Sequence, residues 1–122
     1  MAVSLVAIAS NDQVTAVADS GTTTDTLYTS TGVTTQINAL TVTNTSTSQV
    51  WMSFWILPSG VAASSVPATW TQAIPAGAGG VLDAAAIVSG LLGHIIPAGG
   101  TLKCDAGTTN VCHVTASGIA VS

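Results

Sequence analysis

The sequence predicts an all-β protein: a single-domain, two-sheet antiparallel β-sandwich that is jelly-roll-like and has at most one short helical turn. Thr, Ser and Val are abundant, and the β-branched residues Thr and Val favour pleated strands. Turn-forming Gly, Pro, Asn and Asp recur at short intervals, as a sandwich requires. The length of 122 residues suits one domain and leaves no room for a second core. We therefore expect residues 1–122 to form one sandwich.

Segments of strand length lie between these turn signals, and each is apolar or alternates with Thr and Ser. The segment Val81 to Ile96 is different, because its apolar residues recur at helical spacing while Gly90 and Gly93 weaken a continuous helix. We expect a strand start and one helical turn there. The predicted strands are 2–9, 13–18, 25–29, 34–43, 49–57, 69–74, 80–84, 101–106 and 110–121, with a break in the last near Gly118.

The composition excludes several classes of protein. Only 5% of residues are charged, 48% are hydrophobic, and the mean hydropathy is +0.63, which is the reverse of a disordered chain. The net charge is −4, with a single Lys and no Arg, so nucleic acid and anionic membranes are poor partners. The apolar stretch 81–96 contains Asp83 and His94 and is too short to span a membrane. The N-terminus lacks the basic region of a signal peptide, so no export is expected.

The strand 49–57 is apolar on both faces. Trp51, Trp55 and Leu57 fill one face, while Val50, Met52, Phe54 and Ile56 fill the other. A small sandwich buries one side of each sheet, so the other face needs a cover. Either the loop 61–71 or a neighbouring subunit could provide it. We favour the subunit, and expect a homo-oligomer, specifically a trimer. The predicted interface residues are Val50, Trp51, Met52, Phe54, Trp55 and Trp70.

Residues 1–10 are predicted to form a strand-exchange arm. An uncovered strand of this kind has an unpaired edge that adds readily to another sheet. We expect the arm to pair with a neighbouring subunit or with a shell protein rather than to complete its own sandwich. Its attachment residues are Val3, Leu5 and Ala7.

Two cysteines are the main candidates for side-chain chemistry. Symmetric pairing around Thr108 would place Cys104 and Cys112 opposite each other across a hairpin with a three-residue loop. Three alternatives remain open: a disulfide, two reduced core thiols, or a metal site that adds His113 and His94. Adjacent Cys112 and His113 point to opposite faces of a strand, which argues against joint metal ligation.

No catalytic, cofactor or metal residues are assigned. The sequence contains no Gly-x-Ser-x-Gly elbow, no phosphate-binding glycine loop and no calcium-binding loop. The five Asp residues lie mostly at expected turns or strand ends, where Asp ordinarily binds the backbone. We therefore expect a protein that is not an enzyme and binds no cofactor.

Several short stretches resemble small β-sandwich virion proteins of tailed bacteriophages. In that group a Leu-Tyr-Thr strand precedes a strand ending in Thr-Asn-Thr, then an apolar strand ending in Pro-Ser-Gly, and the chain closes with Ser-Gly and an apolar residue. The corresponding stretches, all within residues 22–121, are Asp25 to Ser30, Ile37 to Thr45, Phe54 to Gly60, Ile96 to Leu102 and Val114 to Ile119.

The resemblance implies a structural protein of a virion, assembled in the host cytoplasm, with no catalytic residues. Within that class we favour a capsid decoration or cement subunit that binds the major capsid protein or another virion protein. A tail, collar or fibre-attachment subunit is the first alternative. A carbohydrate- or surface-binding module is an alternative of another class, because an exposed Trp could act as a stacking platform.

Overall fold

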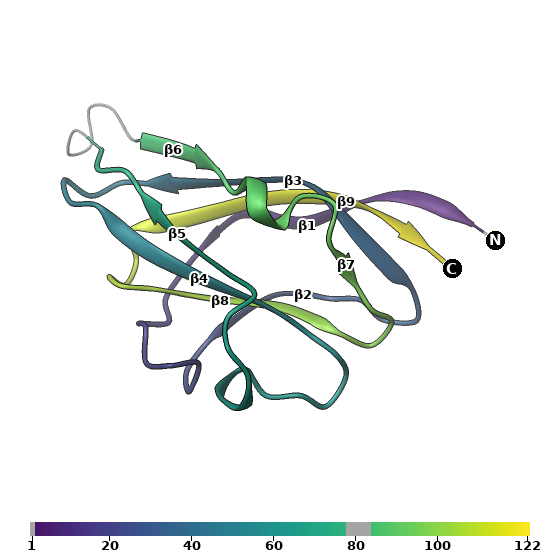
Figure 1. Cartoon of the computed structure of the whole chain (residues 1–122). Coiled ribbons are helices and arrows are strands. Elements are labelled where there is room, and N and C mark those ends of the chain that lie inside the picture. The colour runs from purple at the N-terminus through teal and green to yellow at the C-terminus, as the bar shows by residue number, and fades with distance from the viewer. Residues whose placement is uncertain (1, 78–83) are drawn as a thin grey trace.

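The computed structural model describes residues 2–77 and 84–122 and has two antiparallel sheets packed face to face (Figure 1). The first sheet has the order β1-β9-β3-β6, with β7 also paired to β3, and the second has the order β2-β8-β4-β5. The strands are β1 (Val3–Gln13), β2 (Asp25–Thr29), β3 (Thr34–Asn44), β4 (Val50–Leu57), β5 (Trp70–Ile74), β6 (Ala84–Ile87), β7 (Ile95–Ile96), β8 (Thr101–Ala106) and β9 (Cys112–Val121).

The strand order is that of a jelly roll. Strands β6 and β7 pair with successive parts of β3, at 41–44 and 35–36, so they act as one interrupted strand. Counted in that way, β8 and β9 become the seventh and eighth strands, and the sheets read 1-8-3-6 and 2-7-4-5. This arrangement confirms the predicted all-β, two-sheet, jelly-roll-like class.

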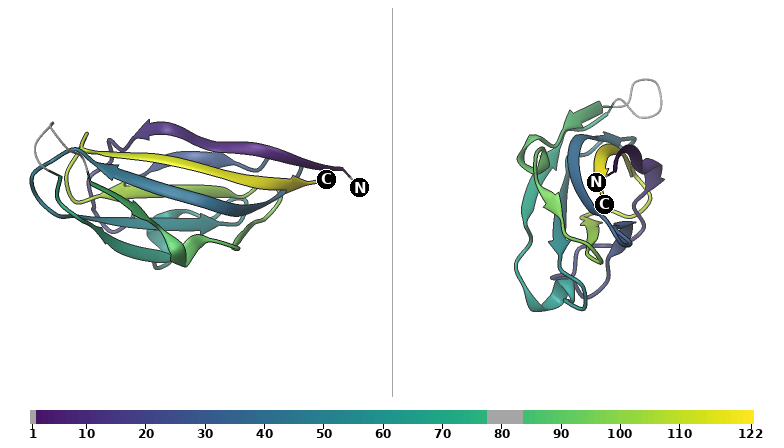
Figure 2. Two further views of the ribbon diagram at one scale, coloured as in Figure 1. Left: turned by 90° about the horizontal axis from the view of Figure 1, so that it is seen from above. Right: turned by 90° about the vertical axis from the view of Figure 1, so that its right-hand side faces the viewer.

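The core lies between the two sheets and takes its largest side chains from both. Met52 and Phe54 enter it from β4, while Ile37 and Leu40 enter it from β3, and all four are essentially inaccessible to solvent. The sandwich is elongated, and both termini lie at one end of it (Figure 2). There the Ser122 N–H donates a hydrogen bond of 3.1 Å to the Ala2 carbonyl.

Most predicted strands are present, with two exceptions. The predicted strand 13–18 is instead the end of β1 followed by a loop, which contacts the second sheet through a parallel bridge between Val17 and Ala106 and through hydrogen bonds from Thr15 and Ala16 to the Asp25 carboxylate. Of the predicted strand 80–84, residues 80–83 lie outside the described residues. The expected helical turn within 81–96 is η2 (Ser89–Leu91), but a second 3-10 turn, η1 (Ala63–Ser65), was not expected.

The predicted hairpin between the two cysteines is wrong. Strand β8 pairs with β2 and β4, whereas β9 pairs with β1 and β3, so the segment between them crosses from one sheet to the other. Asn110 in that segment has a φ of 65°, a left-handed conformation that Asn tolerates. The crossing redirects the chain, and Cys104 and Cys112 therefore belong to different sheets.

Candidate functional site

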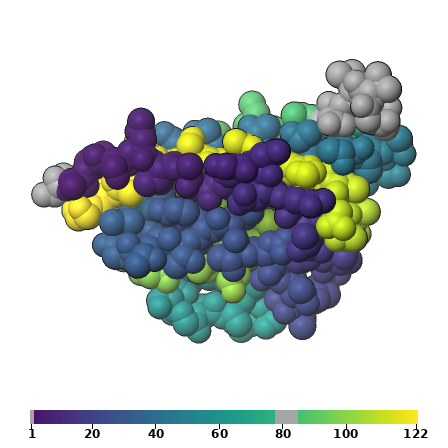
Figure 3. Space-filling view, turned by 180° about the vertical axis from the view of Figure 1, so that it is seen from behind, coloured from purple at the N-terminus to yellow at the C-terminus, as the bar shows by residue number. Residues whose placement is uncertain are grey.

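The N-terminal strand belongs to the chain's own first sheet, which corrects the prediction for residues 1–10. Strand β1 pairs with β9 from Val3↔Val121 to Gln13↔His113, with two register shifts on the way. Ile8 and Ala9 are buried in the core. The strand therefore completes its own sandwich. Because β1 is the end strand of its sheet, its second edge faces outward, and it forms a continuous band on the surface (Figure 3).

The free edge of β1 is formed by the backbone of the three predicted attachment residues. The hydrogen bond from Ser122 to Ala2 identifies these two residues as a hydrogen-bonded pair. Such pairs alternate along an antiparallel ladder, so Ser4 and Val6 bond to β9. The N–H and C=O groups of Val3, Leu5 and Ala7 consequently point away from the sheet, toward its free edge.

The same three side chains lie on the outer face of the first sheet, where a row that includes Leu5 crosses four strands and is apolar except at Gln36. Leu5 is opposite Ile119, which is opposite Gln36, which in turn is opposite Ile95. Leu5 is 84% exposed, Val3 64% and Ile95 47%. Isolated exposed apolar residues are ordinary, but a contiguous group marks an interaction surface. We call Val3, Leu5, Ala7 and Ile119 the terminal patch.

The apolar strand β4 is covered by the chain itself, which corrects most of the predicted interface. Val50, Met52 and Phe54 point into the core between the sheets. Trp55 and Leu57 point to the other face, where Val61, Ala63 and Ala68 pack over them. The loop was the alternative cover, and it buries Trp55 to 4% exposure. These four predicted residues, Val50, Met52, Phe54 and Trp55, are not available to a partner in this structure.

The other two predicted interface residues remain accessible, on different faces. Trp51 lies on the outer face of β4 and is 61% exposed. Trp70 is opposite Phe54 and is 40% exposed. Its ring lies against Gly90, where an added Cβ would come within 2.2 Å of the indole. Trp70 thus covers one side of the sandwich, and it is Trp51 that is free to meet a partner.

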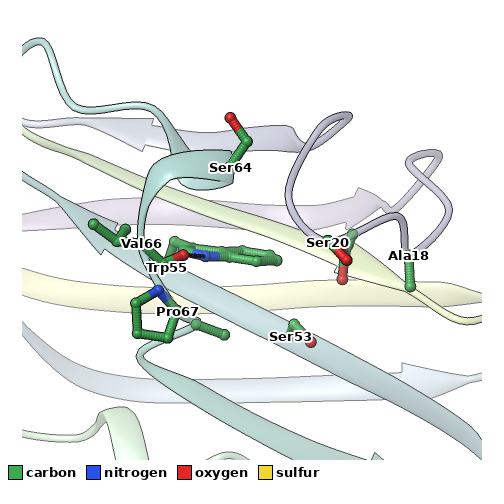
Figure 4. Close-up of a pocket in the computed structure, with 9 residues that line it drawn as sticks. Ala18, Ser20, Ser53, Trp55, Ser64, Val66 and Pro67 are labelled. Carbon is green, nitrogen blue, oxygen red and sulfur yellow. Dashed lines mark hydrogen bonds between the residues drawn. The ribbon is translucent and has the colours of Figure 1, made fainter.

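A pocket of about 410 Å³ opens on the outer face of the second sheet, between two loops. The loop after β1 and the segment around η1 form its walls, and the side chains of β4 and β8 form its floor (Figure 4). The loops meet at Gly21, whose φ of 82° and 2.9 Å approach to the Ala63 backbone exclude a Cβ. The lining residues are Ala18, Ser20, Ser53, Trp55, Ser64, Val66, Pro67, Ala68 and Asp105.

Asp105 is the most unusual group of this pocket. It is 1% exposed, and its Oδ1 atom has no hydrogen-bond partner among residues 2–77 and 84–122. Burial, followed by the charge of Asp19, raises the pKa of the Asp105 carboxyl, whereas backbone groups of Asp19 and Ser53 lower it. The sequence analysis did not assign this residue. The available signal was Ser53, opposite Asp105 on β8, because it interrupts the apolar outer face of β4.

The two cysteines are buried and free. Burial raises the pKa of the Cys112 thiol to about 11. Burial, followed by the charges of Asp25 and Asp105, raises the pKa of Cys104 much further. Thiols this far from ionisation are poor nucleophiles and poor metal ligands at neutral pH. Of the three alternatives, the structure has the two reduced core thiols.

The described residues contain no group of three His, Cys, Asp or Glu side chains that could hold a metal ion. His94, one of the proposed ligands, lies on the surface beside β7. Within residues 2–77 and 84–122, no helix is long and apolar enough to cross a membrane.

No family model and no curated protein matches the sequence. Among solved structures, the chain is similar to part of a protein in the T13 particle of infectious bursal disease virus. The identity is 14% and the TM-score 0.48, over 98% of this chain and 31% of that chain. It is also similar to VP2 in a subviral particle of that virus, with 13% identity, a TM-score of 0.43, and coverage of 98% and 32%. The chain thus spans about a third of the length of these proteins, and a likeness at this level carries no function over to it.

Proposed function

We propose that this chain is a non-enzymatic structural protein of a bacteriophage virion, most specifically a capsid decoration subunit attached to the shell through the terminal patch. The observation that carries the proposal is the free edge of β1. There Val3, Leu5 and Ala7 present apolar side chains on the outer face and unpaired backbone groups at the edge.

Two further features support a role in an assembly. The sequence resembles small virion β-sandwich proteins of tailed phages in five separate stretches. The jelly-roll strand order is also common in capsid domains, although lectin domains share it. Because one fold serves several functions, the fold alone does not select the capsid, and the proposal depends on the attachment edge.

The attachment mode follows from the geometry of the edge. A strand of the shell protein would extend the first sheet by forming hydrogen bonds with the backbone N–H and C=O groups of Val3, Leu5 and Ala7. Its side chains would cover Leu5 and Ile119 on the outer face. Most natural edge strands are protected by Lys, Pro or a covering loop, and Val3 to Ala7 contains neither Lys nor Pro.

The decisive experiment places proline at one position of the edge. Leu5→Pro removes an N–H that points away from β9, so the sandwich should stay folded, while addition of a strand is blocked. Particles depleted of the protein are incubated with each variant, and the bound copies are counted by mass spectrometry. We expect wild type to rebind, Leu5→Thr to rebind partly because it keeps the N–H, and Leu5→Pro to be lost. Full rebinding of a folded Leu5→Pro variant would refute this mode of attachment.

Salt and imaging separate the remaining alternatives. Burial of apolar surface is not screened by ions, so molar NaCl should leave the bound protein in place. Release by salt alone would contradict attachment through the terminal patch. Electron microscopy of the rebound particles distinguishes the shell from a tail, collar or fibre position.

The homotrimer is also part of the proposal. The free protein is examined by sedimentation at micromolar concentration, where we expect a trimer and no monomer. The terminal patch and Trp51 are among the exposed apolar surfaces of the described residues that could make such contacts. A stable monomer would refute the homotrimer. Attachment through the terminal patch would then still be tested by the rebinding assay.

A further inference from the structure

Both walls of the pocket on the second sheet are held in place by hydrogen bonds. The Trp55 Nε1–H donates a hydrogen bond of 3.3 Å to the Val66 carbonyl, which fixes the η1 segment to the floor (Figure 4). The opposite loop is fixed by the Ala18 N–H, which bonds to the Ala106 carbonyl at 2.9 Å.

The floor of the pocket includes one buried acceptor, the Asp105 Oδ1 atom, that none of the described residues uses. A buried carboxylate oxygen ordinarily has a hydrogen-bond partner, and leaving it without one costs free energy. Asp105 lies at the floor beside Ser53 with its Oδ1 unpartnered. A ligand that donates a hydrogen bond to this oxygen would remove that cost.

The rest of the lining indicates what the ligand is. The hydroxyls of Ser20, Ser53 and Ser64 can each donate or accept, and Val66 and Pro67 offer apolar surface between them. A sugar ring has the same mixture, with hydroxyls around its rim and C–H groups on its faces. We propose that this pocket binds a neutral pyranose unit of a glycan, with a ring hydroxyl donating to Asp105.

Size and geometry fit a pyranose better than a small cation. A volume of about 410 Å³ lies at the lower end of the range for ligand pockets, about 300–1,000 Å³, whereas an ammonium group would fill little of it. One edge of the Trp55 indole points into the pocket, toward Ser20 and Ala18 (Figure 4). The edge of an aromatic ring carries partial positive charge, so a hydroxyl oxygen of the ligand can lie against this edge.

The site is separate from the attachment edge. The terminal patch lies on the outer face of the first sheet, and the pocket lies on the outer face of the second. A subunit attached through β1 would therefore keep the pocket open to solution. The inference does not depend on the proposed function, and either one can fail without the other.

The test is a binding titration followed by NMR. The ligands are the methyl α-pyranosides of glucose, galactose and mannose, with n-butylammonium chloride as the cation probe. We expect saturable binding of at least one pyranoside. Asp105→Asn should weaken it by about tenfold or more, the effect of losing a hydrogen bond to a charged group. Ser53→Ala, which removes a lining hydroxyl and keeps the charge, should weaken it less.

Two control variants match these changes. Asp12→Asn removes the same charge from β1, on the other sheet, and should leave the affinity unchanged. Trp51→Ala removes the most exposed Trp on β4 and should also leave it unchanged, which separates the pocket from a stacking platform at Trp51. If Asp105→Asn does not fold, Ser53→Ala alone decides the question.

Four outcomes would overturn the proposal. The first three are no binding of any pyranoside, binding of n-butylammonium alone, and pyranoside binding that Ser53→Ala and Asp105→Asn both leave unchanged. The fourth is loss of pyranoside binding in Trp51→Ala while Ser53→Ala and Asp105→Asn still bind normally. That result would place the ligand at Trp51 and refute the pocket.

Discussion

Each sheet has a group of apolar side chains on its outer face, yet the chain covers only one of these two groups. On β4, Trp55 and Leu57 lie under the η1 segment, and Trp55 is 4% exposed. On β1, Leu5 and Val3 lie under nothing in the described structure and are 84% and 64% exposed. Apolar character therefore marks both surfaces, but it does not say which partner covers each. One is part of the fold, and the other is available for assembly.

The largest expected difference between the two faces is in stability. Trp55→Ala should lower the free energy of unfolding by about 3–5 kcal/mol, because a large buried side chain is replaced by a cavity. Trp51→Ala, on the same face but 61% exposed, should change it by less than about 0.5 kcal/mol. Urea denaturation measures both. Equal effects would mean that the η1 segment does not cover Trp55 in solution.

The second comparison is within β1 and tests which backbone groups are free. Val6→Pro removes an N–H that bonds to β9, so it should cost about 1–3 kcal/mol. Leu5→Pro removes an N–H at the free edge and should cost less than about 1 kcal/mol. Urea denaturation again gives both values. The reverse order would show that the hydrogen-bonding alternation of the strand is opposite to the one described.

The sequence predicted the sheets well because local patterns determine them. The strands 25–29 and 101–106 are correct to the residue, and 34–43 and 49–57 are correct to within one. The prediction of a strand at 13–18 was wrong because buried Val14 and Ala16 alternate with exposed residues, as in a strand, although they belong to a loop. Alternation reports burial of alternate side chains, whatever the backbone does.

The functional surfaces were less predictable because they depend on contacts between distant segments. The cover on Trp55 comes from residues 61–68, whereas the sequence analysis favoured a subunit over the loop. The pocket needs the meeting of Gly21 with Ala63, which no local pattern encodes. By contrast, Val3, Leu5 and Ala7 are exposed on an edge strand, although the strand is part of the chain's own sheet, and their role in attachment stays a prediction.

A smaller effect concerns pH and the pocket. Burial and Asp19 raise the pKa of Asp105 in the folded protein above its ordinary value of 3.8. The neutral Asp105 carboxyl therefore contributes fully to the stability of the folded protein below pH 3.8. This contribution is lost as the pH rises through the raised pKa. Asn does not titrate, so the melting temperature of Asp105→Asn relative to wild type should increase from pH 3 to pH 7. A relative melting temperature that falls over this range would contradict the raised pKa.

The smallest expected effect is that of a reductant, and it separates a core with two thiols from a core with a disulfide. Cys104 and Cys112 come from different sheets and are both buried and free, so dithiothreitol should leave the melting temperature unchanged. A disulfide would contribute about 2–4 kcal/mol, and its reduction would lower the melting temperature by several degrees. The thiols should also resist alkylation by iodoacetamide at pH 8 in the folded protein, because burial raises the pKa of Cys112 to about 11 and the thiolate is the reactive form. Both should react in urea. Rapid alkylation without denaturant would mean that the two sheets separate often enough to expose the core, and the covered and uncovered faces would then differ less than the structure indicates.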